Sequence, residues 1–359
     1  MRVCFISEAK TIHTQRWTRA LSQCGCDIHL ISSSSGDIPN IKLYQVPIYS
    51  QNLLKQRKQK LQIRNLIRKI GPDIIHLFGL FSLSSLGTMG VVKNFGNLII
   101  SVWGSDIVTT RNLESVKSKI IKRYLLNQGK MLLATSDYLA EETRKYCHSN
   151  KTITVLPWGV DLEVFRPTDE RKHRSSFRIG FAKRLHELAG PDVLLKAFQD
   201  VVHKCDRKLV LAIAGDGPMK NYLQHESLKL GLGENIQWLG WLDQPQKLSA
   251  FYKSLDIFVM PSRVESFGVA AVEALASGIP VIASQCGGIP EIVKHGNNGL
   301  LVAPESPNDL ARAIISMVKN DLLRETMGKN ARLIAETRFS WNVSLNRMIE
   351  IYSKVIAGK

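Results

Sequence analysis

The sequence has few cysteines and no long hydrophobic run. Its six cysteines include no Cys-x-x-Cys pair and no Cys/His cluster with zinc spacing, so we expect neither a disulfide framework nor a structural metal. No run approaches 18 consecutive apolar residues, which excludes a membrane-spanning helix. The apolar run after Met1 is too short for a secretory signal peptide. We therefore expect a cytoplasmic protein whose membrane contact, if any, is peripheral and on the inner face of the cell membrane.

Acidic residues are also scarce. The chain has 48 Lys and Arg against 31 Asp and Glu, and residues 1–160 hold 22 basic against 9 acidic side chains. A formal charge of +17 indicates an anionic partner, which is nucleic acid, a phosphate-bearing ligand or an anionic membrane. A basic nucleic-acid-binding protein is an alternative on charge alone. No helix-turn-helix, zinc finger or paired RNA-binding aromatic motif supports it, so we expect no nucleic acid as partner.

The composition is that of a folded protein with two domains. Hydrophobic residues make up 44% and charged residues 22% of 359 residues, a length more than twice that of a usual domain. Short apolar runs alternate with amphipathic stretches, a pattern typical of βα units that build parallel sheets. We expect an α/β fold of two Rossmann-like, doubly wound parallel-sheet domains that face each other across a cleft, where such folds bind ligands.

A polar segment separates two series of βα units. The first domain is expected over residues 1–165 and a linker over 166–176, where charged residues and a proline replace large apolar side chains. The second domain is expected over 177–339, followed by a C-terminal helix over 340–359 that packs back on the first domain. The strands are expected at 2–7, 27–32, 42–47, 73–78, 97–103, 130–135, 152–157, 177–184, 208–214, 236–239, 257–261, 280–284 and 300–302.

Residues 52–70 form the densest basic segment. Seven Lys and Arg share a helical pattern with leucines and isoleucines, and no acidic residue occurs between Asp37 and Asp73. Two interpretations fit this pattern. One is a helix that lies on an anionic membrane surface, and the other is a solvated helix face beside the sheet.

The strongest chemical signal is the segment 261–282, in which an apolar strand runs through a loop into a helix. The first N–H groups of that helix form a natural phosphate site, and Gly268 lets a ligand approach closely because it has no Cβ. Glu265 before the helix and Glu273 within it suit sugar hydroxyls and a ribose diol. An ordinary strand-loop-helix unit with two solvated glutamates shows the same spacing.

This segment, with three others, resembles the donor-binding half of retaining GT-B glycosyltransferases of family 4. The others are Ala214-Gly215-Asp216-Gly217-Pro218, Leu239-Gly240 and Gly287-Gly288-Ile289-Pro290-Glu291. The resemblance covers nearly the whole chain. It implies a hexosyltransferase that moves a sugar from a UDP- or GDP-linked donor to a hydroxyl of a glycan or lipid-linked acceptor. It also implies retention at the anomeric carbon. No Asp-x-Asp triplet occurs, so we expect no metal or other cofactor. A nucleotide-sugar epimerase of the same architecture is the alternative enzyme.

The resemblance also implies roles for individual residues. Glu265 contacts the donor sugar, and Arg184 neutralises the diphosphate. The family usually has a lysine at the position of Ala189, and Lys183 is the candidate that supplies this cation. The remaining donor-binding positions are implied to be Gly215, Gly217, Leu239, Ser266, Phe267, Gly268, Val269 and Glu273. A solvated strand end is the other interpretation of Lys183 and Arg184.

Acceptor candidates lie in the first domain. Trp103 stands where relatives often have a histidine and offers a stacking surface, and Asp106 is either a catalytic contact for substrate hydroxyls or a helix N-cap. The run of residues 13–17 resembles a bacterial subgroup that builds surface polysaccharides and lipid-linked glycans. This implies that His13 and Arg16 face the acceptor or the diphosphate, although a capped helix start with a packed tryptophan explains them equally. We expect His76 to be a satisfied, semi-buried strand residue.

Overall fold

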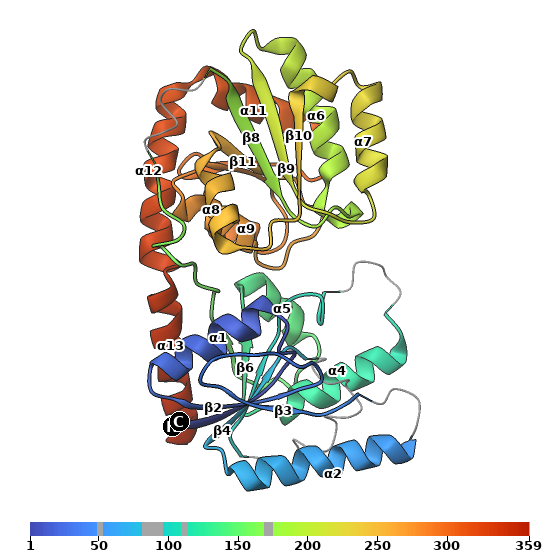
Figure 1. Ribbon diagram of the computed structural model, residues 1–359, viewed down its shortest axis with the longest axis vertical. Coiled ribbons are helices and arrows are strands. Elements are labelled where there is room, and N and C mark those ends of the chain that lie inside the picture. Colours follow the sequence, from blue (N-terminus) through green and yellow to red (C-terminus); the bar gives the residue numbers. More distant parts are fainter. Residues whose placement is uncertain (49–52, 81–95, 109–113, 169–174, 359) are drawn as a thin grey trace. The chain divides into compact units, whose positions relative to one another are not determined.

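Two parallel sheets organise the chain. The structure, a computed structural model, describes residues 1–48, 53–80, 96–108, 114–168 and 175–358. It separates into unit 1, which is Met1–Pro157 with Leu345–Lys359, and unit 2, which is Trp158–Ser344. Each unit is one sheet covered by helices on both faces (Figure 1).

The two sheets have the same kind of strand order. In unit 1 the order is β3-β2-β1-β4-β5-β6-β7, and in unit 2 it is β10-β9-β8-β11-β12-β13. The chain order reverses beside the first strand of each sheet, β1 and β8, as it does in Rossmann folds. The fold class predicted from the sequence is therefore confirmed. The strands are β1 (Arg2–Ile6), β2 (Asp27–Ser32), β3 (Lys42–Gln45), β4 (Ile74–Phe78), β5 (Leu98–Ser101), β6 (Met131–Ala134), β7 (Ile153–Val155), β8 (Phe177–Ala182), β9 (Leu209–Ala214), β10 (Ile236–Gly240), β11 (Ile257–Met260), β12 (Val281–Ser284) and β13 (Gly299–Val302).

Alternate residues of the strands in unit 1 pack on opposite faces of the sheet. Ile6 of β1 belongs to the buried cluster that α2, α4 and α5 cover, whereas the ring of Phe5 lies 5.6 Å from Phe78 on the other face. Phe78 contacts Trp17 of α1 at 6.4 Å between ring centroids. The described helices of this unit are α1 (Ile12–Gln23), α2 (Leu53–Ile70), α4 (Val116–Gln128) and α5 (Asp137–Arg144), with the larger part of α13 (Trp341–Ile356).

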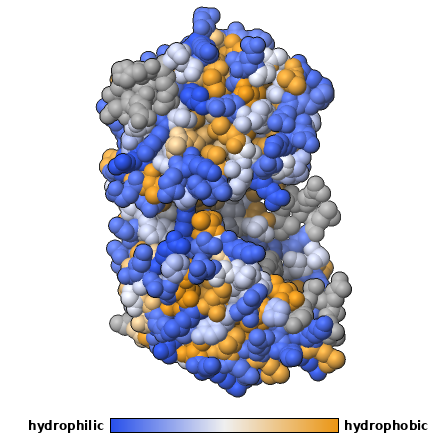
Figure 2. Space-filling model, in the orientation of Figure 1, coloured by the Kyte–Doolittle hydropathy of each residue, from blue (hydrophilic) through white to orange (hydrophobic). Residues whose placement is uncertain are grey.

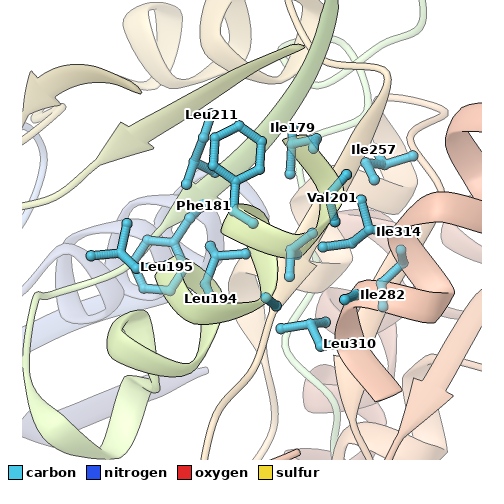
Figure 3. Packing of buried hydrophobic residues seen from close by; sticks show 14 of the residues in the cluster. Ile179, Phe181, Leu194, Leu195, Val201, Leu211, Ile257, Ile282, Leu310 and Ile314 are labelled. Atoms are coloured by element: carbon cyan, nitrogen blue, oxygen red, sulfur yellow. The ribbon is translucent and has the colours of Figure 1, made fainter. Parts of the chain in front are cut away.

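The core of unit 2 has the same two-faced construction. Figure 3 shows Phe181 of β8 near Leu194 and Leu195 of α6, and Leu310 of α11 near Ile282 of β12, and all are buried. A second cluster covers the other face and includes residues of α8, α9 and α12. The helices are η2 (Glu187–Ala189), α6 (Pro191–Lys204), α7 (Lys220–Lys229), η3 (Gly233–Asn235), α8 (Pro245–Lys253), α9 (Val269–Ala276), α10 (Ile289–Ile292), α11 (Pro307–Lys319) and α12 (Asp321–Arg338).

The boundary between the units falls earlier than the expected end of the first domain at residue 165. Residues 158–165 belong to unit 2, because Val160 and Phe165 are buried in its core and the Val160 N–H donates to the Phe339 carbonyl at 2.8 Å. Of the expected linker, residues 169–174 lie outside the described residues. Ser340 Oγ accepts from the Val343 N–H at 3.3 Å, as an N-cap of α13 does.

A buried histidine fixes α13 within unit 1. His76 Nδ1 lies 2.7 Å from the Tyr352 hydroxyl, and His76 Nε2 lies 2.7 Å from Ser101 Oγ. His76 is fully buried rather than semi-buried, and burial lowers its pKa to about 3. The neutral imidazole therefore joins β4, β5 and α13 through two hydrogen bonds.

We expect acid to weaken unit 1 through His76. An unfolded histidine titrates near pH 6.5, so the stabilisation is complete above pH 6.5 and is lost as the pH falls toward 3. Between pH 6.5 and 5 the loss in free energy of unfolding is on the order of 2 kcal/mol. Urea unfolding at both pH values measures it, with His76→Gln as the non-titrating comparison. Burial also lowers the pKa of His13, to about 4. His13 is present in both the original protein and His76→Gln, so its effect cancels in the comparison. An equal pH dependence of the two proteins would contradict the assignment.

Candidate functional site

Three loops at the carboxyl edge of the unit 2 sheet pack backbone against backbone. A Cβ on Gly215 would lie 2.0 Å from the Lys183 carbonyl oxygen, and one on Gly217 would lie 2.5 Å from that of Leu185. A Cβ on Gly190 would lie 2.0 Å from the carbonyl oxygen of Pro261. Only glycine permits these approaches. In the structure Gly215 and Gly217 therefore hold the loop after β8 against the loop after β9.

Lys183 and Glu265 meet across two of these loops. Lys183 Nζ forms an ion pair with the Glu265 carboxylate and donates to Ser262 Oγ at 3.0 Å. Each side chain of the ion pair is 18% exposed. Strand β8 ends one residue before Lys183, so the alternation of a strand does not govern where this lysine points. Ala189, at the position of the family's lysine, is fully buried. The structure thus brings a lysine to Glu265 from a different place in the sequence.

Arg184 is exposed, and its guanidinium forms no hydrogen bond or ion pair with the residues that the structure describes. The charges of Lys183, Arg184 and Glu265 act on the neighbouring His186. Burial lowers the pKa of His186, as do the positive charges of Lys183 and Arg184, whereas Glu265 raises it. The loop after β8 therefore presents two cations and a neutral imidazole. Sequence reasoning missed His186, because its only signal is its place in this loop.

The loop that carries Glu265 leads into α9. Gly268 has φ +110° and provides no side-chain cap, and a Cβ there would lie 2.8 Å from Ile289 Cδ1. The Phe267 N–H lies 3.5 Å from a Glu265 carboxylate oxygen, while the Phe267 ring is buried 6.1 Å from that of Phe339. Phe267 thus turns its ring into the core and only its backbone toward Glu265. The half-buried Ser266 and Val269 flank these residues.

Glu273 lies one turn into α9 and is 6% exposed. The Tyr252 hydroxyl lies 3.2 Å from a Glu273 carboxylate oxygen and 3.1 Å from the Ala270 carbonyl oxygen. Burial raises the pKa of Tyr252, as does the charge of Glu273, so the hydroxyl stays a donor. Sequence reasoning missed Tyr252, which lies on α8 far from the motif. Leu239, in β10, packs partly buried against the same core.

The three predicted acceptor residues come together in unit 1. The rings of His13 and Trp103 lie 5.8 Å apart at 72°, and Trp103 lies 4.9 Å from Phe78. Burial and, to a smaller extent, the charge of the neighbouring Arg16 lower the pKa of His13 to about 4, so the imidazole is neutral at neutral pH. Thr11 also caps α1, so the interpretation as a capped helix start holds alongside this clustering.

Asp106 holds the loop that carries Trp103. Its carboxylate accepts the N–H groups of Leu80 at 3.1 Å, Trp103 at 3.0 Å and Gly104 at 2.8 Å. Burial raises the pKa of Asp106, and these donors oppose that effect. Three backbone donors converge on the carboxylate, so Asp106 shapes the loop, and its contact with substrate hydroxyls stays a prediction.

Among the residues that the structure describes, no three His, Cys, Asp or Glu side chains are grouped as a metal site would require. Within the same ranges, no helix combines the length and apolarity needed to cross a bilayer. All six cysteines are free.

Two family models match the chain. Residues 166–334 match the model described as glycosyl transferases group 1, and residues 2–136 match glycosyl transferase 4-like. The D-inositol 3-phosphate glycosyltransferase of Paenarthrobacter aurescens is 32% identical over 300 residues, which cover 80% of this chain and 70% of the relative. D-inositol 3-phosphate glycosyltransferase 2 of Catenulispora acidiphila is 31% identical over 296 residues, which cover 78% of this chain and 66% of the relative. The chain thus spans about two thirds of the length of these relatives.

Solved structures share the fold. Sucrose-phosphate synthase from Thermosynechococcus elongatus superposes with a TM-score of 0.84 at 19% identity, over 100% of both chains. Anabaena HepE in complex with UDP and glucose gives a TM-score of 0.80 at 20% identity, over 99% of this chain and 100% of HepE. The two sheets, the two family models and the similar relatives agree on one family. The chain belongs to the GT-B glycosyltransferases of the family 4 type.

Proposed function

We propose that the chain is a retaining hexosyltransferase that uses a UDP- or GDP-linked sugar and a glycan or lipid-linked acceptor. The observation that carries the proposal is the gathering of Lys183, Arg184 and Glu265 at the carboxyl edge of the unit 2 sheet, beside the amino end of α9. Cations and helix amides suit a diphosphate, and a carboxylate suits sugar hydroxyls. The HepE complex with UDP and glucose supports a nucleotide-sugar donor.

The residues of unit 2 act by position and charge. The bond from the anomeric carbon to the diphosphate oxygen breaks, and a bond to the acceptor oxygen forms on the same face. Arg184, Lys183 and the amides of Gly268 and Val269 stabilise the negative charge that develops on the diphosphate, without a metal. A diphosphate oxygen takes the proton of the acceptor hydroxyl. Glu265 orients the sugar through its hydroxyls, and Glu273 holds the ribose.

Unit 1 takes the acceptor in this proposal. His13 is neutral at neutral pH, so it both donates and accepts hydrogen bonds to hydroxyl groups. Trp103 offers a ring face for a sugar, and Arg16 offers a charge for a phosphate of a lipid-linked acceptor. Asp106 keeps Trp103 in place.

NMR of the product tests the retaining, metal-independent reaction. The protein is incubated with UDP- or GDP-linked hexoses and lipid-linked acceptors, with and without EDTA. We expect a product with the donor's anomeric configuration at the same rate in both samples. An inverted product contradicts retention, and loss of rate in EDTA contradicts metal independence. Conversion of the donor to its epimer without an acceptor would favour the epimerase.

We also propose that α2 contacts the anionic lipid surface at the inner face of the cell membrane. Its inner side packs in the core through Ile63 and Ile67, but Leu54 and Leu61 are 75% and 59% exposed. Figure 2 shows hydrophilic and hydrophobic residues intermixed where Figure 1 places α2. A surface groove of about 420 Å³ is lined here by Lys58, Leu61, Gln62, Asn65, Leu66 and Lys69. Exposed leucines flanked by lysines suit lipid headgroups and acyl chains. Asn52 lies outside the described residues.

We expect the double variant Leu54→Ser with Leu61→Ser to bind phosphatidylglycerol vesicles about tenfold more weakly than the original protein, because apolar insertion adds to charge attraction. Vesicle flotation measures this at two salt concentrations. Leu228→Ser is the matched control, since Leu228 is 67% exposed on α7 of unit 2. Equal binding by all three proteins contradicts the proposed surface. Stronger binding to DNA than to vesicles would favour the nucleic-acid alternative.

A further inference from the structure

Arg263 forms a dense set of hydrogen bonds two residues before Glu265. Its two terminal nitrogens donate to the two carboxylate oxygens of Asp192 at 2.9 and 2.8 Å, and Nε donates to Glu305 at 2.9 Å. One terminal nitrogen also donates to the Glu187 carbonyl oxygen at 2.5 Å. The Arg263 side chain is 19% exposed. A planar guanidinium whose N–H groups donate to several acceptors fixes the position of its own loop and of the acceptor residues.

Apart from Glu305, the partners of Arg263 belong to the segment that carries Arg184 and to α6, which follows it. Glu187 lies three residues after Arg184, and Asp192 is in the first turn of α6. The Arg263 N–H also donates to the Leu188 carbonyl oxygen at 2.8 Å. The side chain and backbone of Arg263 therefore join the loop after β8 to the loop after β11.

This connection differs from the ion pair between Lys183 and Glu265. Both members of that pair are proposed to bind the donor, so the donor competes with the contact that holds the two loops together. The partners of Arg263 have no role in the proposed donor binding, so the donor does not compete for the hydrogen bonds of Arg263. Glu305 is 65% exposed, and an exposed ion pair contributes little, so Asp192 and the two carbonyls form the effective part of the connection.

We infer that Arg263 is a positioning residue, which sets the separation of the Arg184 loop from the Glu265 loop and so preforms the donor diphosphate site. The inference rests on the proposed function and adds to it a residue that touches neither sugar nor phosphate. A merely structural role would affect stability alone, whereas a positioning role affects nucleotide binding and local loop order.

Two variants and a matched control test this inference. Arg263→Lys keeps the charge but removes the two parallel hydrogen bonds, and Asp192→Asn removes the negative charge and replaces one of the two acceptor oxygens by an NH2 group. Arg324→Lys is the control, because Arg324 is 13% exposed, donates to Asp321 and to the Met317 carbonyl oxygen, and lies over the Phe177 ring at the start of β8. The measurements are amide hydrogen exchange of residues 183–192 and 261–268 without nucleotide, and the dissociation constants of UDP and GDP.

We expect exchange in both segments to rise about tenfold in Arg263→Lys and Asp192→Asn and to stay unchanged in Arg324→Lys. The dissociation constant of the bound nucleotide should rise about tenfold in the same two variants, and the double variant should add little to either one. Unchanged exchange, or equal changes in the Arg324 control, would overturn the inference. If the original protein binds no nucleotide, the proposed function fails, while the exchange data still decide whether Arg263 joins the loops.

Discussion

Replacing Glu265 by Gln should lower the rate of sugar transfer about a thousandfold while the protein stays folded. The glutamate lies in the Lys183 ion pair and next to the Phe267 N–H, at the amino end of α9. The amide keeps the size of the side chain but loses the charge that organises Lys183 and the sugar hydroxyls. Losses of 10²–10³ for one group that stabilises a transition state are typical.

The measurement is the rate of product formation at saturating donor, with the melting temperature recorded in parallel. Glu226→Gln is the control, because Glu226 also pairs with a lysine, Lys229, but on α7. We expect the control to keep full activity. Retention of more than a tenth of the activity in Glu265→Gln would remove Glu265 from the site.

Replacing Arg184 by Ala should have an effect of similar size through the diphosphate. The guanidinium is exposed and contacts no described residue by hydrogen bond or ion pair, so its removal leaves no buried partner unsatisfied. We therefore expect an unchanged melting temperature, a weaker affinity for the nucleoside diphosphate and a rate lower by roughly 10²–10³. Steady-state kinetics with titration of the product nucleotide separates the two effects.

Arg312→Ala is the matched control for this prediction. Arg312 is 74% exposed on α11 and pairs only with Asp309 in the same helix turn. Its loss should leave both rate and affinity unchanged. If Arg184→Ala lowers the rate without weakening nucleotide binding, the arginine acts on the sugar or acceptor and not on the diphosphate.

Much of the fold can be predicted from the sequence, because each strand is recognisable from the few consecutive residues that form it. A strand buried on both faces needs a short run of apolar residues, and most of the thirteen expected strands are such runs. Each expected position holds a strand in the structure, including the partly exposed β3. The boundary between the units is harder to predict. Residues 158–165 resemble an end of the first domain in sequence, but Val160 and Phe165 find their partners in unit 2. Only the tertiary packing reveals this.

The candidate site also has a part that the sequence predicts and a part that it does not. Glu265, Gly268 and Glu273 share one strand-loop-helix unit, so their spacing brings them together. Lys183 and Glu265 are 82 residues apart, and Arg263 and Asp192 are 71 residues apart. No periodicity relates residues at such separations. Their proximity depends on the close approach of the loop after β8 to the loop after β11, which Gly190 permits and which is a property of the folded backbone.

Calorimetric titration of the protein with UDP, GDP and ADP, in EDTA, tests the central claim most directly. The account predicts that one of these nucleotides binds without metal and that Arg184→Ala binds it at least tenfold more weakly, whereas Arg312→Ala binds it like the original protein. Failure of all three nucleotides to bind the folded protein, or equal binding by Arg184→Ala, would contradict a donor site built from Lys183, Arg184, Glu265 and the amino end of α9.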